Sequence, residues 1–133
     1  MENPKSQALN PKEIPNPNVQ NPRRYDLEDR TFAFANRISG FIDKLHKTMS
    51  NVQYIKQLIR SSSSVGANYI EANEAISRKD FLLRIKICRK EAKETIFWLR
   101  LLQLNSSEHE NERVVFIREA IELCKIFGSI ITK

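Results

Sequence analysis

Hydrophobic residues recur at helical spacing along most of this chain, and the clearest stretch runs from Ser77 to Asn105. This stretch contains no proline and no glycine. On a helix that turns about 100° per residue, one of its faces collects residues in steps of three and four, the spacing of a seam in a helical bundle. The residues of this seam are Phe81, Ile85, Cys88, Ala92, Thr95, Leu99 and Leu102. The pattern predicts a long helix that buries one side.

Similar signals divide the chain into four predicted helices, at about residues 26–47, 51–76, 78–105 and 107–131. A capping side chain opens each helix, and an acid or amide follows three residues later, as in a capping box. The predicted caps are Asp26, Ser50, Ser77 and Ser107. No segment alternates apolar and polar residues for long enough to predict a strand. We therefore expect one all-α domain of four helices over residues 25–133.

Residues 1–24 have the composition of a tail. All five prolines lie in the first 22 residues, together with five asparagines. Proline blocks helix formation, and the segment holds too few apolar residues to bury a core of its own. We expect a disordered or extended Pro/Asn-rich N-terminal tail that folding does not require.

The second predicted helix changes character between Ser61 and Asn68, where four serines and a glycine stand close together. These residues are poor helix formers, and a flexible linker is one interpretation. Helical patterning continues on both sides, through Ile59 before the segment and Tyr69 after it. We prefer a continuous helix whose small residues let a neighbouring helix approach closely.

Positive charge is concentrated on the third predicted helix. The chain has a net charge of +6, and residues 77–105 contain eight basic and three acidic residues. Six of the basic residues are our candidates for contacts with the phosphates of RNA or DNA. They are Lys79, Lys86, Arg89, Lys90, Lys93 and Arg100. The alternative is that these residues only solvate the helix and pair with Glu91 and Glu94 at helical spacing.

The third and fourth helices have more apolar surface than one seam uses. On the fourth helix, one seam holds Val114, Ile117 and Ile121, and a second seam holds Phe116 and Phe127. Large aromatic side chains exposed in a cluster are rare on soluble monomers, so we expect a homo-oligomer. The candidate interface residues are Phe97, Trp98, Leu101, Phe116 and Phe127.

Chemistry-bearing motifs are missing from the sequence. Neither His46 nor His109 follows a Glu by three residues, as a di-iron bundle would require. Cys88 and Cys124 fall on predicted core faces, and we expect small buried thiols. We expect no metal, no cofactor and no enzyme activity, and we interpret three polar residues near the small-residue crossing as structural: Asn68, Glu71 and Glu94. Asn68 and Glu71 lie one helical turn apart, and we expect them to form a local polar pair.

The sequence predicts no membrane partner. It contains no apolar run of about 18 residues, which a membrane span would need. The N-terminal residues lack the apolar segment of a signal peptide. We therefore expect a cytoplasmic location by elimination.

Several of these segments resemble the bacterial 23S rRNA intervening-sequence proteins. Residues 60–72 read RSSSSVGANYIEA, Asp80-Phe81 follows, and residues 88–95 read CRKEAKET. The family pattern is matched at Ser64, Asn68, Glu71, Phe81 and Glu94. The chain departs from it at Ala72, where the family has glycine, and at Lys90-Glu91, where the family has Gly-Ser.

The resemblance implies an antiparallel up-down four-helix bundle that assembles as a homopentamer with a basic surface. The accessory variability protein of diversity-generating retroelements is similar, and it binds nucleic acid and a reverse transcriptase. Our first hypothesis is thus a non-enzymatic, oligomeric nucleic-acid-binding accessory protein. Its partners would be itself, RNA or DNA, and a reverse transcriptase or another protein. The alternative is a protein-interaction scaffold whose basic face binds an acidic protein partner.

Overall fold

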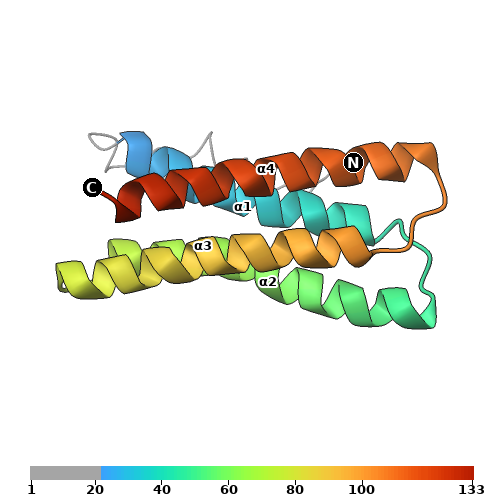
Figure 1. The fold of residues 1–133 in the computed structure, drawn as a ribbon, viewed down its shortest axis with the longest axis horizontal. Helices are drawn as coiled ribbons and strands as arrows, with labels where there is room; N and C mark the ends of the chain where they lie inside the picture. The colour runs from blue at the N-terminus through green and yellow to red at the C-terminus, as the bar shows by residue number, and fades with distance from the viewer. Residues whose placement is uncertain (1–21) are drawn as a thin grey trace, which may run out of the picture.

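A computed structural model describes residues 22–133 of the chain, with side chains from Leu27 onward. Four helices make up this part: α1 (Pro22–Ile42), α2 (Met49–Asn73), α3 (Arg78–Leu101) and α4 (Ser107–Ile131). Successive helices run in opposite directions, and α1 and α4 lie above α2 and α3 in the view of Figure 1. The described residues contain no strand, and the all-α four-helix bundle predicted from the sequence is confirmed. The prediction of a tail falls mainly on residues 1–21, outside the described residues.

Helices that follow one another in the sequence form the main interfaces. The α2–α3 interface is the most extensive, followed by α3–α4 and then α1–α2. Among neighbouring helices, the backbones of α1 and α4 approach each other least, and side chains make the contact between them: Phe41 packs against Phe116, and Arg30 and Lys44 pair with Glu119 and Glu112. The bundle is therefore held together mostly by its α2–α3–α4 part.

The core contains the predicted seam of α3. Six of its seven residues are buried, and Phe81 is partly buried against the same cluster. From the other helices the largest fully buried side chains are Ile38, Phe41, Leu58, Leu123 and Phe127. Each buried Leu, Ile or Phe of this kind contributes about 1.5–3 kcal/mol relative to an exposed side chain.

Several helix ends differ from the sequence expectation. The α1 helix begins at Pro22, so the predicted cap Asp26 lies inside the helix, and α2 ends at Asn73 and not near residue 76. The α1 helix ends at Ile42, where Lys47 Nζ donates to the carbonyl of Ile42 (2.9 Å). Thr48, and not Ser50, caps α2, since its hydroxyl accepts a hydrogen bond from Asn51 N (3.1 Å). The α3 helix ends at Leu101, because the backbone of Leu102 is extended.

The connections before α3 and α4 follow the expected chemistry more closely. Ser77 caps α3 and accepts from Asp80 N (3.1 Å), as predicted. Ser106 caps α4 and accepts from His109 N (3.1 Å), one residue before the predicted Ser107. In both caps the serine hydroxyl satisfies a backbone N–H that would otherwise lack a partner at the helix start.

The serine segment of α2 is helical throughout, so the linker interpretation is wrong. Hydroxyls that lack an outside partner bond back to carbonyls one turn earlier, as Ser63 does to Ile59 O (2.7 Å). The small residues also admit α1: a Cβ atom at Gly66 would lie 3.0 Å from Thr31 Oγ1. The predicted close approach of a neighbouring helix is therefore present at this glycine.

Candidate nucleic-acid interface

The six predicted phosphate-binding residues lie on α3 and are referred to here as the basic stripe: Lys79, Lys86, Arg89, Lys90, Lys93 and Arg100. All are exposed except Arg89, which is half-buried. Within residues 22–133, none of the six forms an ion pair with a carboxylate. The stripe therefore presents uncompensated positive charge to solvent along the whole of α3.

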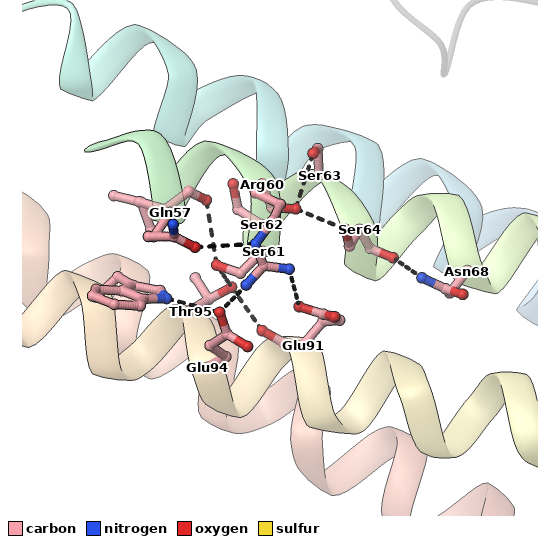
Figure 2. Close-up of polar contacts among 12 residues, drawn as sticks. Gln57, Arg60, Ser61, Ser62, Ser63, Ser64, Asn68, Glu91, Glu94 and Thr95 are labelled. Carbon is pink, nitrogen blue, oxygen red and sulfur yellow. Dashed lines mark hydrogen bonds and ion pairs between the residues drawn. The ribbon is translucent and has the colours of Figure 1, made fainter. Parts of the chain in front are cut away.

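The carboxylates that could have neutralised the stripe are engaged by α2. Arg60 Nη1 donates to Glu91 Oε1 (3.2 Å), and Arg60 Nη2 pairs with Glu94 Oε2 (Figure 2). Glu94 Oε2 also accepts a hydrogen bond from Trp98 Nε1 (2.9 Å). Because Arg60 holds both acids on the α2 side of α3, the pairing of the stripe with Glu91 and Glu94, which was the alternative interpretation, does not form.

A buried polar contact lies beside this ion-pair cluster. Thr95 Oγ1 lies 2.9 Å from Ser61 Oγ and 2.8 Å from the carbonyl of Glu91 (Figure 2). Both hydroxyl side chains are fully buried. The contact fixes the register between α2 and α3, and thereby the position of Arg60 relative to the two carboxylates.

Asn68 is a structural polar residue, but its partner is not the predicted one. Its Nδ2 donates to Ser64 O (2.9 Å), and its Oδ1 accepts from Arg84 Nη1 (3.0 Å). Glu71 is exposed, and the expected Asn68–Glu71 pair is replaced by this contact between α2 and α3. Arg84 is thus a basic residue of α3 that packs inward and does not belong to the stripe.

The seam of α4 that was expected at an oligomer interface faces the core of the chain, while the other seam is only partly buried. Phe116 and Phe127 are 8% and 0% exposed, so they belong to the core of the single chain and are not free for an oligomer interface. Val114 and Ile121, which were expected in the core, are about two-fifths exposed at 42% and 40%. The inward aromatics contact other rings; for example, the centroids of Phe116 and Phe41 lie 5.3 Å apart.

Of the α3 interface candidates, Phe97 is the most exposed at 53%, whereas Leu101 is exposed and Trp98 half-buried. Eighteen residues separate Phe97 from Lys79, so at about 100° per residue both side chains leave the helix in the same direction. Phe97 therefore lies within the basic stripe. Sequence reasoning treated the two sets as separate, although the same angular count could have joined them.

The two thiols are unsuited to nucleophilic chemistry. Burial raises the pKa of the Cys88 thiol from 9.0 to about 12. Burial also raises the pKa of Cys124, against the opposing effect of Lys93 and Arg89. Cys124 Sγ lies 3.9 Å from the backbone carbonyl of Arg89, so this residue of the stripe lies on the side of α3 that faces α4.

Other kinds of site find little support in the described part of the chain. No group of three or more His, Cys, Asp and Glu side chains in it could hold a metal ion. Within residues 22–133, no helix combines the length and hydrophobicity needed to cross a membrane. His109 packs edge-on against Phe41, with ring centroids 6.1 Å apart.

Arg60 and Arg113 are the residues with clear roles that sequence reasoning missed. Arg113 extends from α4 and donates to the carbonyls of Leu99 (3.1 Å) and Leu102 (2.7 Å) at the end of α3. A cation there also suits the negative end of the helix dipole. Neither role has a local sequence signal, since each depends on the register between two helices.

Comparison with known proteins identifies relatives of the whole bundle. The family model for the 23S rRNA-intervening sequence protein matches residues 23–129 of the chain. Among solved structures, the chain is similar to a protein of unknown function from the S23 ribosomal protein family of Bacteroides thetaiotaomicron. The two are 33% identical, with a TM-score of 0.72, over 83% of this chain and 98% of that chain. Among curated proteins, none matches the chain.

Proposed function

The chain belongs to the family of 23S rRNA-intervening sequence proteins, and from this premise we propose that it is a nucleic-acid-binding accessory protein. The basic stripe of α3 would contact phosphates without reading the base sequence. The family description names ribosomal RNA, which makes RNA the first polymer to test.

One observation supports this proposal above the others: the stripe forms no ion pair among the described residues, while both glutamates of α3 are bound by Arg60. Had the stripe existed only to solvate the helix, Glu91 and Glu94 would have been available to balance it at helical spacing. Instead Arg60 pairs with both, and the positive field of α3 faces solvent. An exposed cluster of one sign of charge attracts partners of the opposite sign.

The length of the stripe suits a polymer. Lys86 and Arg100 are fourteen residues apart, which is roughly 20 Å along a helix that rises about 1.5 Å per residue. If all six residues of the stripe neutralise phosphates, affinity should fall about 1,000-fold between 50 and 200 mM salt.

The proposal includes assembly of several copies. Exposed apolar residues on α3 and α4, such as Leu101, Val114 and Ile121, support a homo-oligomer, and the family resemblance suggests a pentamer. Several stripes in one assembly would raise the affinity for long polymers through multivalency. Light scattering at micromolar concentration tests this part, and a clean 15.5 kDa monomer would contradict it.

We further propose a binding role without catalysis, in the cytoplasm. Arg60 engages both glutamates of α3, and the raised pKa of Cys88 disfavours its thiolate. Both cysteines are free, which suits a reducing compartment. A reverse transcriptase as protein partner rests on the resemblance to the retroelement accessory protein alone.

The central experiment is a charge reversal with a matched control. The test variant changes Lys86, Lys90 and Lys93 to Glu, and binding to a labelled RNA is measured at about 50 mM salt, where phosphate contacts are strong. Circular dichroism and light scattering are used to check that the test variant stays folded and assembled. Loss of binding is the expected result.

The control variant changes Arg37, Lys56 and Arg118 to Glu, which are exposed cations on α1, α2 and α4. It alters the net charge by the same amount without touching the stripe. Equal loss in both variants would show that net charge alone attracts RNA. If the wild-type protein binds no nucleic acid at about 50 mM salt, the proposal fails and a scaffold for an acidic protein takes its place.

A further inference from the structure

Phe97 is an exposed aromatic ring inside a row of cations. Lys93 lies four residues before it and Arg100 three residues after it, so each is about one helical turn away on the same side of α3. The ring is 53% exposed, although burying a Phe side chain is strongly favourable. A basic face that carries an aromatic ring matches the way proteins bind single-stranded nucleic acid, with cations on the backbone and rings against bases.

The ring is held in place by a chain of contacts that leads into the bundle. Phe97 packs edge-on against Trp98, with centroids 4.9 Å apart and planes at 78°. Trp98 in turn donates to Glu94 and lies against Tyr54 of α2, with centroids 6.4 Å apart. Glu94 is paired with Arg60 (Figure 2). The Phe97 ring is therefore supported, through Trp98, by the same cluster that leaves the stripe unneutralised.

We propose that the basic stripe takes single-stranded nucleic acid, and that Phe97 stacks on an unpaired base while Lys93 and Arg100 contact the flanking phosphates. This inference rests on the proposed function and adds the class of ligand. In a duplex the bases are stacked and paired, and exposing one of them carries an unstacking penalty. A ring that projects from the outside of a helix therefore reaches a base readily only in a single strand.

The charge around Phe97 favours this ligand over a second copy of the chain. A two-fold contact between copies at Phe97 would place one basic stripe against another, whereas a contact within a ring of copies would bring Phe97 against a different surface and is tested below by light scattering of Phe97→Ala. Like charges brought together at an interface oppose association. A nucleic acid instead supplies a phosphate for each cation next to the ring.

The test compares Phe97→Ala with the wild-type protein on two ligands, a 20-nucleotide oligo(U) and a blunt-ended RNA duplex of similar length without unpaired bases. Anisotropy of the labelled ligands gives both affinities. Loss of one base–aromatic stack weakens binding by about 5- to 100-fold, so the oligo(U) affinity should fall by that factor. The duplex affinity should change less than about twofold, since the phosphate contacts remain.

Two further variants separate the ring from general apolarity. Phe97→Leu keeps an apolar side chain but removes the ring, and it should lose oligo(U) affinity as Phe97→Ala does. Leu83→Ala removes another exposed apolar side chain from the same helix and should bind normally. Trp98 is the single tryptophan of the chain, so oligo(U) binding should also quench its fluorescence in the wild-type protein.

The outcomes distinguish this inference from the function on which it rests. Suppose that the charge-reversed variant loses binding, but Phe97→Ala either keeps its oligo(U) affinity or loses affinity for both ligands equally. The proposal that Phe97 stacks on a base is then wrong, and the proposal that the basic stripe binds nucleic acid is retained. If Phe97→Ala dissociates the assembly in light scattering, the ring belongs to an interface between copies and the inference is overturned. If the wild-type protein binds neither ligand, both proposals fail.

Discussion

Replacing Arg60 tests whether its ion pairs with Glu91 and Glu94 stabilise the contact between α2 and α3. Arg60 pairs with Glu91, whose side chain is only 10% exposed, and with Glu94, whose side chain is 32% exposed. In Arg60→Met the aliphatic contacts of the side chain are largely kept, but Glu91 loses its cation. The variant therefore isolates the effect of leaving a mostly buried carboxylate without a partner.

The magnitude follows from the exposure of the two partners. A fully exposed ion pair contributes about 0.2–1 kcal/mol, whereas removing one partner of a fully buried pair costs about 3–5 kcal/mol. The Arg60 side chain is 45% exposed, whereas that of Glu91 is only 10% exposed. The expected loss of unfolding free energy therefore lies between these limits, at about 1–2 kcal/mol. For a domain of this size the melting temperature should fall by about 4–8 °C.

Thermal unfolding followed by circular dichroism at pH 7 measures this loss. Lys56→Met is the matched control, because Lys56 is an exposed cation one turn earlier on α2 with no ion pair among the described residues. Adding Glu91→Gln to Arg60→Met should restore at least half of the loss, since a neutral amide is easier to bury. The reasoning is refuted if Arg60→Met loses no more than Lys56→Met, or if Glu91→Gln has the same effect with and without Arg60.

Three other predictions concern the core, a cap and a thiol. Phe116→Ala should lower the free energy of unfolding, measured in urea, by about 3 kcal/mol, and Phe32→Ala, at an exposed residue, by less than about 0.5 kcal/mol. Similar losses in the two variants would show that Phe116 is not buried. Thr48→Ala should cost about 1 kcal/mol and Ser50→Ala clearly less, and the reverse order would show that the cap was assigned to the wrong residue. Cys88 stays protonated in the fold to about pH 12 but loses its proton near pH 9 when unfolded, so its stabilising effect is complete below pH 9 and is lost as the pH rises toward 12. Stability measured from pH 8 to 11 should fall less in Cys88→Ala than in the wild-type protein.

The fold was predictable because the signals that specify it are local. The seam of α3 is visible as a run of three- and four-residue steps, and Ser77 provides its cap in the predicted place. Local sequence signals did not indicate which of the two seams of α4 faces the core. The apolar residues of α4 cover so wide an arc that either stripe could face inward, and only the position of the neighbouring helices decides that Phe127 is buried and Ile121 half-exposed.

The exposed charges of the candidate site could be predicted from the sequence, but the ion pairs beside them could not. Exposed lysines such as Lys86 and Lys90 follow from their position opposite the seam. The assignment of Glu91 to Arg60 joins residues 31 positions apart, and no spacing rule connects them. The register that joins them is set by packing between α2 and α3, including the buried contact of Ser61 with Thr95.

The order of the interfaces has a consequence for how the chain folds. Each extensive interface joins helices that are consecutive in the sequence, so most native contacts can form after closing a short loop. Helical bundles of such low contact order fold in microseconds to milliseconds. The α1–α4 contact, made by side chains such as Phe41 and by ion pairs from Arg30 and Lys44, joins the two ends of the bundle sequence and must close over a long stretch of chain. Amide hydrogens of α1 should therefore exchange at a lower opening free energy than those of α2 and α3, with α1 detaching as a unit while the other three helices stay packed.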